Sequence, residues 1–193
     1  MLVAILAAGA SRRLGQPKQL VSLLGEPLLR RQCKIGIQAQ IGPIVVILGC
    51  HANECLRSID DLPISKYFND DWQDGLASSI RQAVQAAQGI DASGLLLVHA
   101  DQYRVTADDL RTLHNAWSAS PSSACVATYG GDFGPPVIFP KHCFDKLQQL
   151  QGDVGGRRIL ASLRESQLIR VPLPNALHDL DTPSQLTAMV VNG

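Results

Sequence analysis

The loop formed by residues 6–18, LAAGASRRLGQPK, concentrates residue types that can bind phosphate. Arg12, Arg13 and Lys18 place three cations within seven residues. Gly9 lies among small residues, so a phosphate group could approach the main-chain amides there. A triphosphate carries about four negative charges, and a glycine-containing loop with nearby cations can cradle it. A solvated basic turn is the alternative that the loop alone leaves open.

Two acidic segments follow much later in the chain. The buried-looking strand in residues 95–103, LLLVHADQY, ends in Asp101, and residues 178–186, HDLDTPSQL, contain Asp179 and Asp181. A carboxylate at the carboxyl end of a strand can hold Mg²⁺ against triphosphate oxygens. On an extended backbone, side chains two residues apart point the same way, so either later aspartate could complete a metal site. The alternatives are that Asp101 caps a turn and that Asp181 begins a helix cap.

The elements that must position these residues follow from an alternation of short apolar runs and longer amphipathic segments. Apolar runs at 2–6, 44–48, 95–98 and 124–128 predict strands, and the segments at 27–40, 76–88, 107–118, 141–150 and 183–191 predict helices. Near-continuous apolar strands alternating with helices predict an α/β fold that is doubly wound, with a mostly parallel sheet and helices on both faces. We expect residues 1–193 to form a single domain. Ligands of such sheets bind beyond the carboxyl ends of the strands.

Composition and missing motifs exclude several classes of function. The 17 basic and 17 acidic residues give a net charge of zero, so the basic excess of a nucleic-acid-binding protein is absent. No GxGxxG and no GK followed by Ser or Thr occurs, which argues against an NAD-dependent oxidoreductase and a P-loop protein. The arginines follow the first apolar run, which is also too short to span a membrane, so we expect a cytoplasmic protein. The five cysteines are expected to be buried, reduced thiols.

The first loop resembles the signature of MobA-like NTP transferases: LAAG, a small residue, Ser, any residue, Arg, Leu or Met, Gly, two residues and Lys. The branch that it resembles most is the molybdenum cofactor cytidylyltransferases. This resemblance implies that Arg13 and Lys18 bind phosphate and act in catalysis with Asp101, while Arg12 is at a variable position. It also implies a nucleotide-binding set comprising Leu6, Ala7, Ala8, Gly9, Ser11, Arg13, Lys18, Gly75, Ser79 and Asp101.

The resemblance extends from Leu2 to Leu186 with its motifs in order. Asp101 falls at the metal-binding Asp of an Asp-Gln-Pro motif, although Ala100 and Tyr103 depart from the usual pattern. Residues 179–183 resemble an Asp-x-Asp-Thr-Pro segment, and Asp181 is favoured as the second metal ligand because it directly precedes Thr-Pro. In residues 69–80, Gly75 and Ser79 precede or begin a helix, for which an ordinary helix start is the alternative. Arg157 could hold an anionic acceptor or be a surface arginine.

The resemblance implies an enzyme that uses Mg²⁺ to transfer CMP from CTP to the terminal phosphate of molybdopterin or molybdenum cofactor, releasing pyrophosphate. Family members favour CTP with LAAG and GTP with LAGG, so Ala8 favours CTP. A transferase of the same fold that uses GTP or another phosphorylated acceptor is one alternative. Another is a nucleotide-binding factor that delivers the cofactor without much turnover. A molybdoenzyme or its maturation factor is a possible protein partner.

Overall fold

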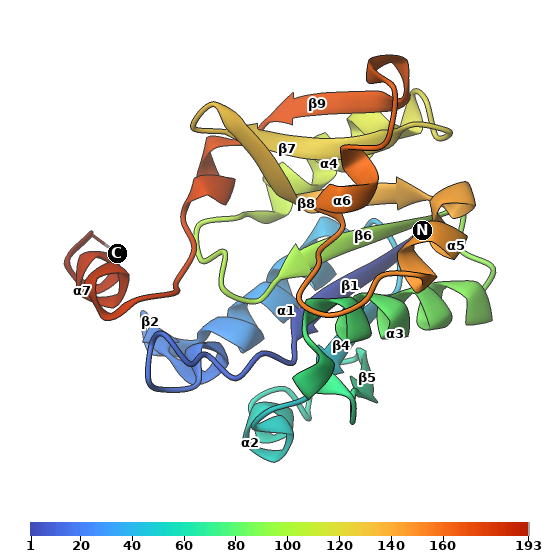
Figure 1. Cartoon of the computed structure of the whole chain (residues 1–193). Helices are drawn as coiled ribbons and strands as arrows, with labels where there is room; N and C mark the ends of the chain where they lie inside the picture. Colours follow the sequence, from blue (N-terminus) through green and yellow to red (C-terminus); the bar gives the residue numbers. More distant parts are fainter. Residues whose placement is uncertain (193) are drawn as a thin grey trace.

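The computed structural model describes residues 1–192 as a central sheet covered by helices on both faces (Figure 1). Within these residues the sheet has seven strands in the order β5-β4-β1-β6-β8-β7-β9. Their bounds are β1 (Leu2–Ala7), β4 (Ile44–Leu48), β5 (Ser65–Phe68), β6 (Gly94–His99), β7 (Ala124–Tyr129), β8 (Asp132–Pro140) and β9 (Leu168–Pro172). A small hairpin pairs β2 (Ser22–Leu23) with β3 (Glu26–Pro27).

Seven α-helices connect or follow the strands of the described chain. They are α1 (Leu28–Ala39), α2 (Ala52–Arg57), α3 (Leu76–Gly89), α4 (Ala107–Ser118), α5 (Phe144–Gln148), α6 (Arg157–Leu160) and α7 (Pro183–Asn192). Short 3-10 helices lie at η1 (Lys18–Leu20), η2 (Trp72–Asp74), η3 (Lys141–Cys143), η4 (Glu165–Gln167) and η5 (Pro174–Leu177). The helix expected over residues 141–150 is therefore divided between η3 and α5. The expected start of α4 is confirmed, because Thr106 and Asp109 form a capping box.

The sheet is doubly wound and mostly parallel, as the alternation of strands and helices predicts. β1 pairs in parallel with β4 and β6, and β7 pairs in parallel with β9. β8 is antiparallel to both of its neighbours, β6 and β7, and the sequence pattern did not predict it as a strand. Pro135 and Pro136 have no N–H to donate, and the register of β8 against β7 shifts where they occur, between Val126 and Ala127. The two prolines therefore make this strand hard to recognise from sequence, although its other residues pair with β6 and β7.

The two faces of the sheet carry separate apolar cores, because side chains alternate between faces along each strand. In β1, Leu2, Ala4 and Leu6 face the core that includes α3, α5 and α6. The intervening Val3 and Ile5 face the core that includes α1, α2 and α4. Burial on both faces explains why the parallel strands read as continuous apolar runs.

A third, smaller cluster lies away from the sheet and joins the two ends of the chain. Leu14 from the first loop and Leu28 at the start of α1 pack with Leu180 and with Met189 of α7. Tyr103, which occupies the place where the family motif has proline, packs against this cluster. The cluster therefore brings the segment around Asp181 back beside the first loop.

All five cysteines are unpaired, and four of them are buried as expected, whereas Cys50 is only partly buried. Burial raises the pKa of Cys33 and Cys55 to about 12, so both thiols stay protonated near neutral pH. Among residues 1–192, no helix is both long and apolar enough to cross a membrane.

Candidate active site

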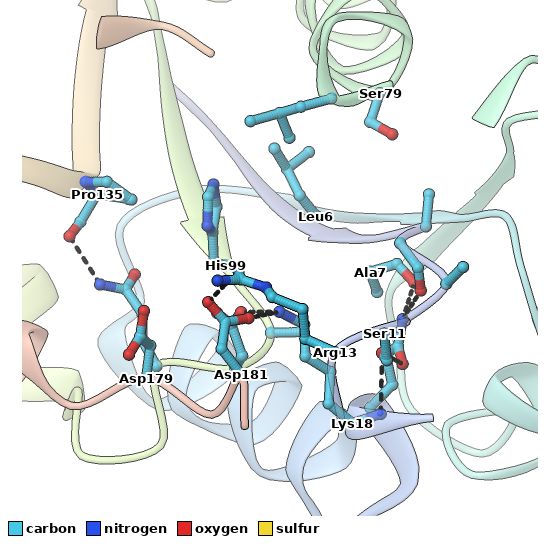
Figure 2. Close-up of a pocket in the computed structure, with 18 of the residues that line it drawn as sticks. Leu6, Ala7, Ser11, Arg13, Lys18, Ser79, His99, Pro135, Asp179 and Asp181 are labelled. Atoms are coloured by element: carbon cyan, nitrogen blue, oxygen red, sulfur yellow. Dashed lines mark hydrogen bonds and ion pairs between the residues drawn. The ribbon is translucent and has the colours of Figure 1, made fainter. Parts of the chain in front are cut away.

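A cavity of about 740 Å³ opens at the carboxyl ends of β1 and β6 (Figure 2). This is the edge at which a doubly wound sheet binds its ligands. Every site residue named from the sequence for nucleotide, metal or catalysis lines this one cavity. They are Leu6, Ala7, Ala8, Gly9, Ser11, Arg13, Lys18, Gly75, Ser79, Asp101 and Asp181. Their convergence is a structural finding, whereas their individual roles stay predictions.

The loop after β1 is held in shape by the buried side chain of Gln19, which is 1% exposed. Its Nε2 donates to the carbonyl of Ala7 at 2.9 Å and to that of Gly9 at 2.7 Å. Ser11 adopts a left-handed backbone with φ of 54°, and its Oγ donates to Gln19 Oε1 at 3.2 Å while accepting the Lys18 amide at 3.1 Å. The sequence did not predict a structural role for Gln19, and the only feature that could have suggested one is its position next to Lys18.

Lys18 lies at the charged centre of the cavity. Its Nζ donates to Asp101 Oδ2 and, at 2.9 Å, to Asp181 Oδ1. Arg13 Nη2 donates to the other oxygen of Asp181 at 2.7 Å (Figure 2). These pairs join segments that are 83, 163 and 168 residues apart along the chain. The tertiary fold thus gathers two cations and two carboxylates where a phosphate chain could enter.

Charge pairing favours the ionised forms of Lys18 and Asp181 near neutral pH. Burial acts to lower the pKa of Lys18, but the charge and hydrogen bond of Asp101, aided by Asp181, raise it above its usual value. Burial acts to raise the pKa of Asp181, yet Lys18 and Arg13 hold it below its usual value. Asp179 also lines the cavity, and there burial and the neighbouring carboxylates raise the pKa. Burial lowers the pKa of His99, the last residue of β6, which favours its neutral form.

One end of the cavity is formed by the segment between β5 and α3 and by the first turn of α3. Gly75 has a φ of 91°, and a Cβ on it would come within 2.6 Å of the backbone of Gly152, so glycine is required there. Ser79 is buried, lines the cavity and accepts a hydrogen bond from Asn69 Nδ2 at 3.0 Å. Trp72, which the sequence reading missed, lines the cavity at this end too.

The opposite end is formed by the loop after β6, by β8 and by η5. Gln102 is 3% exposed, and its Nε2 donates to the carbonyls of Pro135 at 2.8 Å and Ala176 at 3.0 Å. Tyr129, at the end of β7, also lines this end of the cavity. Arg157, considered from sequence for the acceptor, pairs instead with Asp132 and does not line this cavity.

A family model described as the MobA-like NTP transferase domain matches residues 3–168. The chain belongs to the MobA-like NTP transferase family. The match spans the first loop, Asp101 and most of the sheet, so the family expected from the first loop is confirmed.

Relatives of this MobA-like transferase extend over nearly its whole length. Purine catabolism protein PucB of Bacillus subtilis is 30% identical over 189 residues, covering 93% of this chain and 91% of that protein. A probable molybdenum cofactor guanylyltransferase of Rhodopirellula baltica is 30% identical over 200 residues, covering 96% and 90%. The crystal structure of Rv0371c from Mycobacterium tuberculosis has a TM-score of 0.85 at 25% identity, covering 99% of this chain and 97% of that one. Rv0371c has also been solved in complex with manganese. The MobA-like chain described here is thus a nucleotidyltransferase, with homologues named for molybdenum cofactor nucleotidyl transfer.

The carboxylates of this MobA-like transferase fit a divalent cation. Asp101 Oδ1 is buried and has no hydrogen-bond partner, which leaves an unused acceptor beside the cavity. Asp101 and Asp181 share the single ammonium of Lys18, so two anionic groups already converge on one positive charge. Mg²⁺ commonly binds through one or two protein carboxylates and takes further ligands from substrate phosphates and water. Within residues 1–192, no group of three or more His, Cys, Asp or Glu side chains is arranged to hold a metal ion.

Proposed function

We propose that this transferase moves CMP from CTP to the terminal phosphate of molybdopterin or molybdenum cofactor, releasing pyrophosphate, in the cytoplasm. The observation that carries the proposal is the meeting of Lys18, Asp101 and Asp181 at the centre of the cavity. Such a set suits a reaction in which two polyanions must be brought together. Its catalysis would be positioning plus electrostatic stabilisation, as in other phosphoryl-transfer sites.

The acceptor supplies its own nucleophile in this mechanism. The second pKa of a phosphate monoester is about 6, so the group is already anionic near neutral pH and needs no general base. An acceptor oxygen forms a bond to the α-phosphorus of CTP while the bond to the pyrophosphate oxygen breaks. Lys18 stabilises negative charge that builds up at the α-phosphate, and Arg13 with the Gly9 loop holds the departing phosphates. Both cations would exchange contacts with Asp181 for contacts with the triphosphate.

Asp101 and Asp181 are the proposed ligands of Mg²⁺. When bound, the ion would neutralise charge on the phosphate oxygens and align them for displacement. The unpaired Oδ1 of Asp101 supports this role. Rv0371c, a protein of the same fold, has been solved in complex with manganese, which supports a divalent ion as the cofactor.

The preference for CTP is supported by Ala8. Ala8 lines the cavity. The LAAG sequence around it resembles that of the branch of the family that uses CTP, and this resemblance supports the choice of CTP. GTP is the second candidate, because two relatives are named probable molybdenum cofactor guanylyltransferases.

Pyrophosphate release tests the proposal directly. Purified protein is incubated with Mg²⁺, a molybdenum cofactor extract and each of the four NTPs. We expect release with CTP alone, and a loss on the order of 10²–10³ in rate for Lys18→Ala. Lys146→Ala is the matched control, because Lys146 is exposed on α5 and does not line the cavity.

Three other results would change the proposal in different ways. Release with GTP alone would keep the mechanism and overturn the choice of CTP. Release with a different phosphorylated acceptor, and none with the cofactor extract, would overturn the choice of acceptor. Binding of CTP without release under any condition would favour a cofactor-delivery factor.

A further inference from the structure

Asp179 and Asp181 flank a residue that is firmly anchored. Leu180 is fully buried in the small apolar cluster beside α7, and its backbone amide donates to the carbonyl of Asp101 at 3.1 Å. Both flanking aspartates line the cavity. The backbone therefore presents two candidate carboxylates to one cation, and the side chains around them must determine which one binds it.

The two carboxylates have different partners. Asp181 pairs with the cations of the first loop, whereas Asp179 accepts a hydrogen bond at 3.1 Å from the side-chain amide of Gln185 on α7. In Figure 2, Asp181 lies beside Arg13, and Asp179 lies on the side of Pro135, at the end of the cavity where we expect the acceptor. Asp179 is thus held apart from the charged centre.

Gln185 also caps α7. Its Oε1 accepts the backbone amides of Asp181 and Thr182, each at 2.9 Å, and its own backbone amide donates to Thr182 Oγ1 at 3.3 Å. The reciprocal bonds with Thr182 are those of a capping box, which needs only a side-chain oxygen at the later position and forms with glutamate as well as with glutamine. The Nε2 bond to Asp179 is therefore an additional contact that the helix start does not require.

We propose that Gln185 is a positioning residue that determines which aspartate binds the cation. Its Oε1 holds the backbone of Asp181, and its Nε2 keeps the Asp179 carboxylate away from Lys18, so that Asp181 completes the site with Asp101. The inference rests on the proposed function, because it takes a divalent cation to bind at Asp101 and Asp181. Residues that orient metal ligands commonly change metal affinity or activity by tenfold or more when they are replaced.

Gln185→Glu separates the two roles of Gln185. Glutamate keeps the oxygen that caps α7, and a carboxylate is favourable near a helix N-terminus, so the midpoint of urea denaturation should stay close to that of the wild type. Glutamate cannot donate to Asp179 and places a second negative charge beside it, so Asp179 should turn to the cation. We expect Mn²⁺ to bind about threefold more tightly, because the ligand charge increases. We expect kcat to fall about tenfold, because an extra carboxylate takes a position that phosphate or water needs.

Adding Asp179→Asn to Gln185→Glu should restore the hydrogen bond with its polarity reversed. The new asparagine amide can donate to the new glutamate, and the pair again carries one negative charge. Gln185→Glu should therefore change kcat and Mn²⁺ binding by less than about twofold when Asp179→Asn is already present, as in a double-mutant cycle for two residues in contact. A residue that only caps the helix would not show this dependence on Asp179.

Ser184→Glu is the matched control for the added charge. Ser184 is exposed, precedes Gln185 on α7 and does not line the cavity, so kcat and Mn²⁺ binding should stay close to those of the wild type. The EPR signal of free Mn²⁺ measures binding by the protein alone, and steady-state pyrophosphate release measures kcat.

The outcomes separate the role of Gln185 from the reaction. Equal Mn²⁺ binding and equal kcat in wild type and Gln185→Glu would overturn the positioning role even if the wild type releases pyrophosphate from CTP. The same changes in Ser184→Glu, an effect of Gln185→Glu that does not depend on Asp179, or a marked fall in the urea midpoint would also count against it. Mn²⁺ binding that follows the expected pattern, in a protein that releases no pyrophosphate, would keep the positioning role and overturn the proposed reaction.

Discussion

The loop after β1 and the acceptor end of the cavity are stabilised by the same type of residue over different distances in the sequence. At the phosphate loop, the buried Gln19 donates to carbonyls 10 and 12 residues away. At the acceptor end, the buried Gln102 donates to carbonyls 33 and 74 residues away. The phosphate loop is therefore a local structure, whereas the acceptor end exists only after β8 and η5 have packed. In the proposed function, the local loop would hold the phosphates, and the long-range contacts would shape the acceptor site.

The largest effect on catalytic rate is expected at Asp181, and it should be much larger than the effect at Asp179, which lines the same cavity. Asp181 contacts Lys18 and Arg13, while Asp179 accepts a hydrogen bond from Gln185 at 3.1 Å. We expect Asp181→Asn to lower kcat on the order of 10²-fold, because it weakens a proposed ligand of the Mg²⁺ that neutralises the phosphates. Asp179→Asn should cost less than about tenfold, or about 1.4 kcal/mol. Steady-state pyrophosphate release measures both.

The same pair of variants tests the choice of metal ligand. Asp181→Asn should also raise the Mn²⁺ concentration needed for half-maximal rate, and Asp179→Asn should not. If Asp179→Asn gives the larger loss and the larger shift in Mn²⁺ dependence, Asp179 is the second metal ligand.

An intermediate effect is expected from the two buried glutamines. Each of Gln19→Leu and Gln102→Leu leaves two carbonyls without their donor, at about 1–3 kcal/mol each. Gln19→Leu should lower the free energy of unfolding by at least about 2 kcal/mol. The loss for Gln102→Leu should be smaller, because Gln102 Oε1 is buried without a partner and its removal offsets part of the cost. Urea denaturation measures these losses.

Kinetics of the two glutamine variants sharpen the comparison further. Gln19→Leu should raise KM for CTP, and Gln102→Leu should raise KM for the acceptor. Equal effects of both variants on both KM values would show that the two ends are not independently stabilised.

The smallest effect is expected at an ion pair outside the cavity. Arg30 on α1 makes two contacts with Asp61, at 2.5 and 2.8 Å, and this hydrogen bonding lowers the pKa of Asp61 from 3.8 to about 2. The stabilisation is therefore fully present above the unfolded pKa and is lost as pH falls from about 4 towards 2. Asp61 is exposed, so the contribution should be small even at neutral pH.

NMR titration of the Asp61 carboxyl group, with Arg30→Gln for comparison, measures this shift. We expect the pKa to return towards 3.8 in Arg30→Gln, while the rate of pyrophosphate release stays unchanged. A normal Asp61 pKa in the wild type would show that the pair does not form in solution. A change in rate would show that this surface pair influences the cavity.

Much of the phosphate end could be predicted from sequence because its signals are local. The apolar runs of β1 and β6 locate the strand ends, and Lys18 and Asp101 follow those ends closely. The acceptor end gave weaker sequence signals. Pro135 and Pro136 make β8 hard to recognise as a strand, and Tyr129 and Phe133 are residue types that occur in many strands. Arg157 attracted attention as a cation near the acceptor, but its pairing with Asp132 depends on β8.

By itself, the sequence determined which segments are strands and helices in most of the chain, and it predicts that the loop after the first strand binds phosphate. It did so because periodic burial and glycine-rich turns are properties of neighbouring residues. Only the tertiary structure decided that Lys18 contacts both Asp101 and Asp181, and that Gln102 donates to the carbonyls of both Pro135 and Ala176. Apolar packing is non-directional. A hydrophobic pattern therefore predicts that a strand is buried, but it does not predict which strand lies beside it.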